Sequence, residues 1–148
     1  MEAYRIRNNK IEKCKREKLK VILDANAFFV PLKFKIDIFE ELRSLLNRNF
    51  EPILLSPVKK ELEKMVKEES PKMRKEALYA LKMAEKCSLL EVDENYQGSP
   101  DDAIVHVAQK LECPVFTNDK ELKRRLRNIN VPVIYVRQKS QLEVDGRI

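Results

Sequence analysis

The sequence contains little glycine, cysteine, histidine or tryptophan, and these shortages exclude several classes of functional site. Its 2 glycines form no G-x-G-x-x-G or Walker-type segment, so nucleotide binding through backbone amides is not expected. The 3 cysteines, Cys14, Cys87 and Cys113, are far apart and lack C-x-x-C or Cys/His ligand spacing, which is simplest for free thiols in a reducing cytosol. The single histidine, His106, lies on the apolar side of its expected helix, which favours the core or an interface over a metal ligand.

The chain also lacks a long apolar run. Its N-terminal segment is too highly charged for a secretory signal, and no stretch approaches the length of a membrane span. We therefore expect a cytoplasmic protein without a membrane partner. The 148 residues, of which 43% are hydrophobic, suit one domain with an ordinary core.

Positive charge is in excess, with 30 Lys and Arg against 24 Asp and Glu and a net charge of +6. Such an excess suits a polyanionic partner. An overall basic chain with small acidic clusters is expected of a nuclease that holds phosphates with cations and cuts them with a metal. Residues 1–18 are basic without an apolar period, and we expect a short helix or an arm that either contacts nucleic acid or is solvated.

Apolar runs and helical spacing alternate from residue 20 onwards, which predicts a β/α fold over residues 19–137. Five short strands are expected, at residues 20–24, 52–56, 89–92, 114–117 and 132–136. Helices are expected between them, at residues 38–46, 57–66, 71–84, 100–108 and 119–127. Short connections between such elements favour a mostly parallel sheet with helices on both faces. Residues 138–148 form a tail with no assigned element.

Acidic residues follow four of these strands. Asp24 ends the first, Glu61 lies one turn into the helix after the second, Asp101 and Asp102 follow the third, and Asp119 follows the fourth. In a parallel sheet these positions meet at one edge, and a divalent cation would relieve the repulsion between converging carboxylates. Because the donors are all oxygens, Mg or Mn fits better than zinc.

Each acid also has a structural explanation. Asp24 suits a helix cap or a solvated loop, and Glu61 lies in a highly charged helix. Ser99 and Asp102 fit a capping box, with the neighbouring acid as an alternative or outer ligand. Asn118 and Glu121 fit an N-cap and its third helical residue, where acids meet the helix dipole favourably. The recurrence of an acid after each of four strands is what favours a shared site.

Cations are concentrated beside the last acid. Such a run is either a solvated helix face or a surface that follows a phosphate backbone, and we favour nucleic-acid contact. The residues are Lys120, Lys123, Arg124, Arg125 and Arg127.

The segments VILDAN, LLSPVKKELEKM, SPDDAIVHVA and VFTNDKEL, in this order, resemble the PIN-domain family of metal-dependent ribonucleases over residues 20–136. The resemblance implies a three-layer α/β/α fold with a central five-stranded, mostly parallel sheet, Mg or Mn as cofactor, and hydrolytic endonuclease cleavage of RNA. It assigns catalysis to Asp24, Glu61, Asp102 and Asp119, metal binding to Asp24, Asp101, Asp102 and Asp119, and supporting roles to Asn26 and Thr117.

The stretch TNDKELKRRLRNINVPVIYVRQK looks most like the branch of the family that processes ribosomal RNA. The expected substrate is therefore single-stranded RNA or a ribosomal RNA precursor, with pre-ribosomal proteins and a second copy of the chain as further partners to consider. Three alternatives stay open: an inactive RNA-binding assembly factor, a toxin-type PIN ribonuclease, and a phosphohydrolase or phospho-acceptor acting through Asp24. The last is disfavoured because LDAN lacks the second acid of a D-x-D motif.

Overall fold

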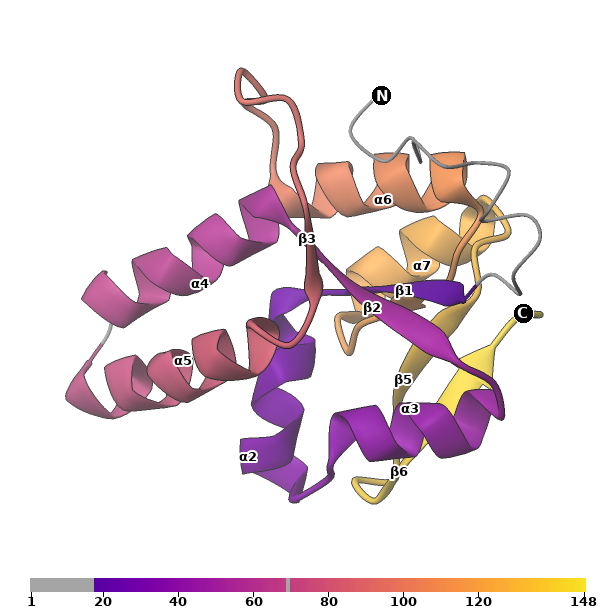
Figure 1. Ribbon diagram of the computed structural model, residues 1–148, viewed down its shortest axis with the longest axis horizontal. Coiled ribbons are helices and arrows are strands. Elements are labelled where there is room, and N and C mark those ends of the chain that lie inside the picture. Colours follow the sequence, from indigo (N-terminus) through magenta and orange to yellow (C-terminus); the bar gives the residue numbers. More distant parts are fainter. Residues whose placement is uncertain (1–17, 69) are drawn as a thin grey trace.

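The computed structural model describes residues 18–68 and 70–148 (Figure 1). Six strands form one sheet in the order β3-β2-β1-β4-β5-β6, in which the first five are mutually parallel and β6 is antiparallel to β5. Their bounds are Leu19–Leu23 (β1), Phe50–Leu55 (β2), Ser88–Leu90 (β3), Val115–Phe116 (β4), Val133–Arg137 (β5) and Gln141–Asp145 (β6). The predicted arm lies outside the described residues, apart from Lys18.

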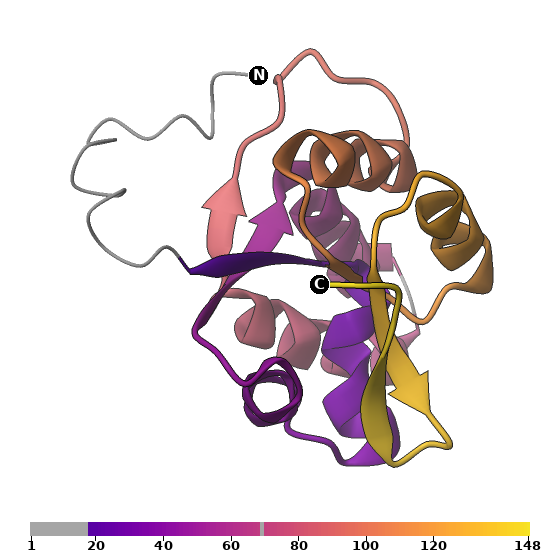
Figure 2. The same ribbon diagram turned by 90° about the vertical axis from the view of Figure 1, so that its right-hand side faces the viewer.

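Helices cover both faces of the sheet, which confirms the predicted three-layer α/β/α fold. Figure 2 shows α6 and α7 on one face and α3 and α5 on the other. The helical segments are η1 (Ala25–Phe29, a 3₁₀ helix), α2 (Val30–Phe34), α3 (Ile38–Leu46), α4 (Ser56–Glu68), α5 (Pro71–Ala84), α6 (Pro100–Leu111) and α7 (Lys120–Asn128). Among the described residues, no helix is long and apolar enough to cross a membrane.

The core follows from the apolar strands. Val21, Ile22 and Leu23 of β1 are fully buried, as are Val115 and Phe116 of β4, because these central strands have helices on both faces. The chain proceeds from β1 towards β3 on one side of the sheet and from β4 towards β5 on the other, so the order reverses between β1 and β4. In open α/β sheets this switch point is where ligands bind, beyond the carboxyl ends of the strands.

The sixth strand corrects the prediction of five. Val136 pairs with Leu142, which is only 6% exposed, so the expected tail is part of the sheet. The turn between β5 and β6 has positive φ at Gln138 (54°) and Lys139 (60°), the pattern of a type I′ hairpin turn. Such turns usually carry Asn-Gly, and the Gln-Lys sequence therefore gave no turn signal.

Three smaller expectations also differ from the structure. Residues 25–34 had no predicted element, yet they form η1 and α2. Their sequence is mostly apolar, so it lacks the alternation of apolar and polar faces that predicts a helix. Asp119, and not Asn118, is the N-cap of α7. His106, predicted to lie in the core or at an interface, is exposed on α6, so it is not a core residue.

Two helices extend beyond the body of the sheet. Figure 1 shows α4 and α5 side by side, reaching past the end at which β1 stops. Ser70 caps α5, with its Oγ accepting a hydrogen bond from the Met73 amide at 3.3 Å, as the Ser-Pro pattern predicted. The pair forms a wall beside the switch point.

Candidate active site

Asp24 lies at the switch point, where β1 ends. It is 5% exposed, and both carboxylate oxygens accept hydrogen bonds. Oδ1 accepts from the Ala25 amide at 2.7 Å, and Oδ2 accepts from Asn26 Nδ2 at 3.0 Å and from Thr117 Oγ1 at 2.8 Å. Since every torsion of this side chain is fixed by a partner, Asp24 is held in one orientation before any ligand binds.

Thr117 and Asn26 connect the ends of neighbouring strands. Thr117, fully buried after β4, accepts hydrogen bonds from the Asp119 amide at 3.0 Å and from Asn26 Nδ2 at 3.3 Å. Asn26 Oδ1 accepts from the Asn118 amide at 3.0 Å, and Asn118 Oδ1 accepts from the Val136 amide of β5 at 2.9 Å. These bonds fix the ends of β1, β4 and β5 relative to one another. The predicted supporting positions of Thr117 and Asn26 thus adjoin Asp24, whereas the link through Asn118 was not foreseen.

Asp119 has a capping role as well as a place at this edge. Its Oδ1 accepts from the Glu121 amide at 2.8 Å and from the Leu122 amide at 3.2 Å, at the N-terminus of α7. The charge of Asp119 also raises the pKa of Asp24 and of Asp101. The capping explanation therefore holds for Asp119, and its charge also acts on two of the other predicted site residues.

The two adjacent acids of α6 have different interactions. Asp102 is exposed, and its Oδ1 lies 2.9 Å from Arg125 Nη2 of α7, while its backbone amide donates to Ser99 Oγ at 3.1 Å. Asp101 is half-buried, and partial burial followed by the charge of Asp119 raises its pKa, against a smaller opposing effect of Arg125. Asp101 is thus coupled by charge to Asp24 and Asp119, while Asp102, whose charge adds to the raised pKa of Asp101, pairs with Arg125.

Four carboxylates influence one another at this edge, and we call Asp24, Glu61, Asp101 and Asp119 the edge acids. Burial above all raises the pKa of Asp24, and the charges of Asp101 and Asp119 add to it, against the hydrogen bonds from Thr117 and Ala25. Partial burial, then the charges of Asp24 and Asp101, raise the pKa of Glu61. Four segments far apart in the sequence therefore bring their negative charges together.

The donor chemistry of the edge acids fits a hard divalent cation. All the donors are carboxylate oxygens. A cation would offset the repulsion that adds to the effect of burial on the pKa values of Asp24, Glu61 and Asp101. In residues 18–68 and 70–148, however, no three Asp, Glu, His or Cys side chains are already arranged around one point. Mg²⁺ commonly takes one or two carboxylates directly and keeps several waters.

The basic face of α7 is largely paired with acids. Arg125 pairs with Asp102, Arg124 with Glu121, and both Lys123 and Arg127 with Asp145 of β6, at 3.5 and 3.3 Å. Lys123 also lies 3.6 Å from the centre of the Tyr135 ring. Of the five predicted RNA contacts, only Lys120 has no ion pair within the described residues. Exposed pairs contribute about 0–1 kcal/mol, so a phosphate can still compete for these cations.

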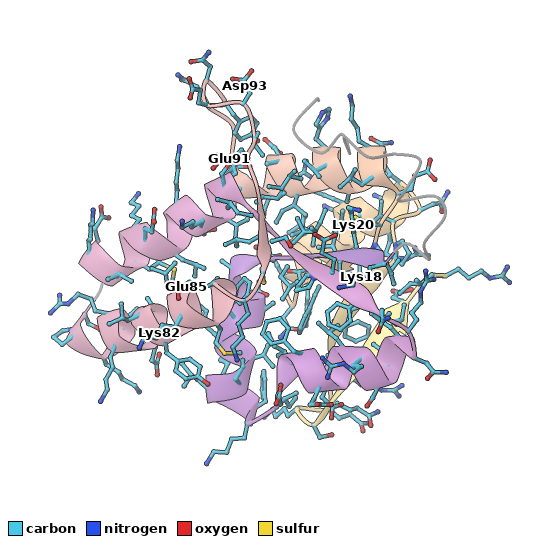
Figure 3. All side chains as sticks on the ribbon, viewed as in Figure 1. Lys18, Lys20, Lys82, Glu85, Glu91 and Asp93 are labelled. Atoms are coloured by element: carbon cyan, nitrogen blue, oxygen red, sulfur yellow. The ribbon has the colours of Figure 1, made fainter. Side chains whose placement is uncertain are left out.

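A groove that we call the lysine groove lies on the other side of the edge acids. It has a volume of about 420 Å³ and is lined by Lys60, Glu61 and Lys64 of α4 and by Tyr96 of the β3–α6 connection. That connection is acidic and stands away from the sheet, as Figure 3 shows for Glu91 and Asp93. In the sequence, Lys60 and Lys64 resemble ordinary surface charge, and no pattern marks them as neighbours of the β3–α6 connection.

Comparison with known proteins agrees with this geometry. A family model described as a PIN-like domain matches residues 21–139. Ribonuclease VapC4 of Methanocaldococcus jannaschii is 36% identical over 132 residues, covering 87% of this chain and 98% of that protein. The rRNA-processing protein FCF1 of Saccharomyces cerevisiae is 30% identical over 119 residues, covering 78% of this chain and 59% of that protein. The structure of the PIN domain endonuclease Utp24 superposes with a TM-score of 0.73 at 31% identity, covering 87% of this chain and 92% of that one.

Proposed function

Because this chain belongs to the PIN-like domain family, we propose that it is a metal-dependent endoribonuclease that hydrolyses RNA phosphodiester bonds through the edge acids. The observation that carries the proposal is the position of Asp24, which is buried at the switch point of the sheet and fixed there by Thr117 and Asn26. Burial above all, and then the charges of Asp101 and Asp119, raise its pKa. Carboxylates that repel one another in an otherwise well-satisfied fold are costly, and such perturbed groups mark functional sites. The relatives named as ribonucleases support RNA as the substrate.

Each residue of the site has a role in this proposal. Asp24 is fixed by Thr117 and Asn26, so a cation held there keeps a constant position relative to the RNA. Asp119 uses Oδ1 for its helix cap, so Oδ2 is the oxygen that would bind a cation. When bound, Mg²⁺ or Mn²⁺ activates water and stabilises negative charge on the phosphoryl oxygens.

Cations on both sides of the edge acids would hold the RNA backbone. Lys60 and Lys64 line the lysine groove, and Arg125 stands on the opposite side, on α7. Glu61, Glu91, Asp93 and Glu94 line the same groove, so a phosphate there would need the cation at the edge acids as well as Lys60 and Lys64.

Processing of a ribosomal RNA precursor is the finer form of the proposal. The similarity to FCF1, named as an rRNA-processing protein, supports it, and so does the superposition on Utp24. The higher identity to VapC4 supports ribonuclease activity without naming a substrate. A panel of ribosomal precursor, transfer and messenger RNA fragments would separate these substrates.

The test is Mn²⁺-dependent cleavage of single-stranded RNA by the wild-type protein and by Asp24→Asn. Asp37→Asn is the matched control, because Asp37 is an exposed aspartate that caps α3 away from the edge. We expect cleavage by the wild type and by Asp37→Asn that stops in chelator, and none by Asp24→Asn. Cleavage that persists in Asp24→Asn would contradict the proposal, and RNA binding without any Mn²⁺ affinity would favour the assembly-factor alternative.

A further inference from the structure

A second groove, which we call the apolar groove, is lined by residues of η1, α2, α4 and α5. Figure 1 shows these helices next to one another. The volume of the groove is about 590 Å³. Aromatic, thioether and aliphatic side chains form most of its lining: Phe29, Val30, Leu32, Phe34, Met65 and Met73. None of the roles assigned above uses this surface.

The apolar groove is continuous with the edge acids. Asn26, Asn118 and Asp119 line one end of it, and the first two belong to the hydrogen-bond network that fixes Asp24. A chain that passes Asp119 with a phosphate at the edge acids therefore has its neighbouring nucleotide at the mouth of this groove.

The lining suits a flat, largely apolar group. Leu32 is 39% exposed although it is a large aliphatic residue, so the groove leaves apolar surface open to water. Phenylalanine rings stack on nucleobases of any sequence, and methionine side chains adapt to differently shaped rings. A nucleobase that has left its stack presents the matching surface.

The charges at the groove indicate how the nucleotide would lie. Lys33 and Glu76 line the groove, and neither side chain has an ion pair or hydrogen bond to another residue in the described part of the chain. A backbone phosphate is attracted to Lys33 and repelled by Glu76. The sugar-phosphate chain would then follow the Lys33 side while the base turns inwards.

We propose that the apolar groove is a subsite for one unstacked nucleobase of single-stranded RNA, adjacent to the phosphate at the edge acids. This inference rests on the proposed function, because it takes RNA as the substrate. It adds that the protein holds a base as well as the backbone, and that paired RNA is excluded until a base is released from its helix.

The test measures RNA binding in chelator, where no cleavage can occur. The probes are an eight-nucleotide oligocytidine and an abasic oligomer of the same length, both labelled for fluorescence anisotropy. Base–aromatic stacking predicts that wild-type protein binds oligocytidine about 10-fold more tightly than the abasic oligomer. Leu32→Ser and the double variant Leu32→Ser/Met73→Ser should lose most of that difference. Leu78→Ser is the matched control, because Leu78 is 52% exposed on α5 and does not line the groove.

Two results would overturn the proposal. One is equal affinity of the wild type for both oligomers, and the other is a base preference that survives in the folded double variant. If the natural occupant of the groove were an apolar segment of a partner protein, one of these two results would be obtained. Cleavage is assayed separately, so the two proposals can fail independently. A protein that does not cleave RNA but shows a groove-dependent base preference would refute the proposed nuclease function and support the base subsite. A protein that cleaves RNA without that preference would support the nuclease function and refute the subsite.

Discussion

Replacing Asp101 and Asp102 by asparagine, one at a time, separates two roles that the adjacent acids divide between them. Asp102 pairs with Arg125 on the surface, whereas Asp101 interacts electrostatically with Asp24, Glu61 and Asp119. Asparagine keeps the shape of each side chain and removes only its charge. Any difference between the two variants therefore reports on where each charge acts.

The structure sets the size of both effects. The side chains of the Asp102–Arg125 pair are 57% and 41% exposed, so their attraction contributes less than about 1 kcal/mol to folding. The Ser99 cap is retained in Asp102→Asn, because it uses the backbone amide. Asp101→Asn removes one of the repelling edge acids, so its stability should be equal to or slightly above that of the wild type. Its Mn²⁺ affinity should fall at least about 10-fold, the loss seen when even an outer partner of a metal site is removed.

Calorimetric titration with Mn²⁺ and urea unfolding provide the two measurements. We expect Asp101→Asn to lose metal affinity and keep its stability, and Asp102→Asn to keep its metal affinity within about 3-fold, well under one tenfold step of 1.4 kcal/mol. If Asp102→Asn lost as much affinity as Asp101→Asn, the assignment of Asp101 to the edge acids would be refuted.

Three further outcomes test other parts of the structure. Thr117→Val removes a buried hydroxyl that serves Asp24, so the free energy of unfolding should fall by about 1–3 kcal/mol in urea and recover in Thr117→Ser; an unchanged value would contradict the network. Leu142→Ala should cost about 2 kcal/mol in thermal unfolding because Leu142 is buried on β6, and a cost within about 0.5 kcal/mol would mean that the strand is not part of the core. Because the pKa values of Asp24, Glu61 and Asp101 are raised, protons remain on these groups above the ordinary carboxyl range. Mn²⁺ affinity should therefore fall as the pH is lowered, and Mn²⁺ binding should release protons. Titrations in two buffers of different ionisation enthalpy would detect the released protons, and a pH-independent affinity would contradict the prediction.

The fold was largely predictable because its parallel strands are apolar on both faces. The runs that end at Leu23 and Leu55 leave no alternation to mistake for a surface strand, and Ser-Pro pairs mark the starts of α5 and α6. The hairpin strand β6 was not predicted, because Gln138 and Lys139 in its turn are residue types that rarely adopt positive φ and so gave no turn signal. Pairing in that case is decided by burial of Leu142, a tertiary effect that local sequence does not contain.

The candidate site was predictable in its elements and less so in its orientations. Strand ends place Asp24 and Asp119 at one edge whatever their side chains do. The choice between Asp101 and Asp102 depends on which one faces Arg125, 23 or more positions away, and a doubled acid gives no sign of it. The same limit applies to the basic helix, whose cations meet Asp145 only once β6 has folded back.

The hydrogen bonds that fix Asp24 also determine when the site can exist during synthesis. Asp24 and Thr117 are 93 positions apart, and Asn26 and Asn118 are 92 apart, so none of these bonds can form until most of the chain has left the ribosome. Contacts of such long sequence separation also form late in folding. A nascent chain that ends before β4 carries Asp24 without Thr117 and Asn26 without Asn118. The order of the strands thus delays the proposed cutting activity until the domain is nearly complete.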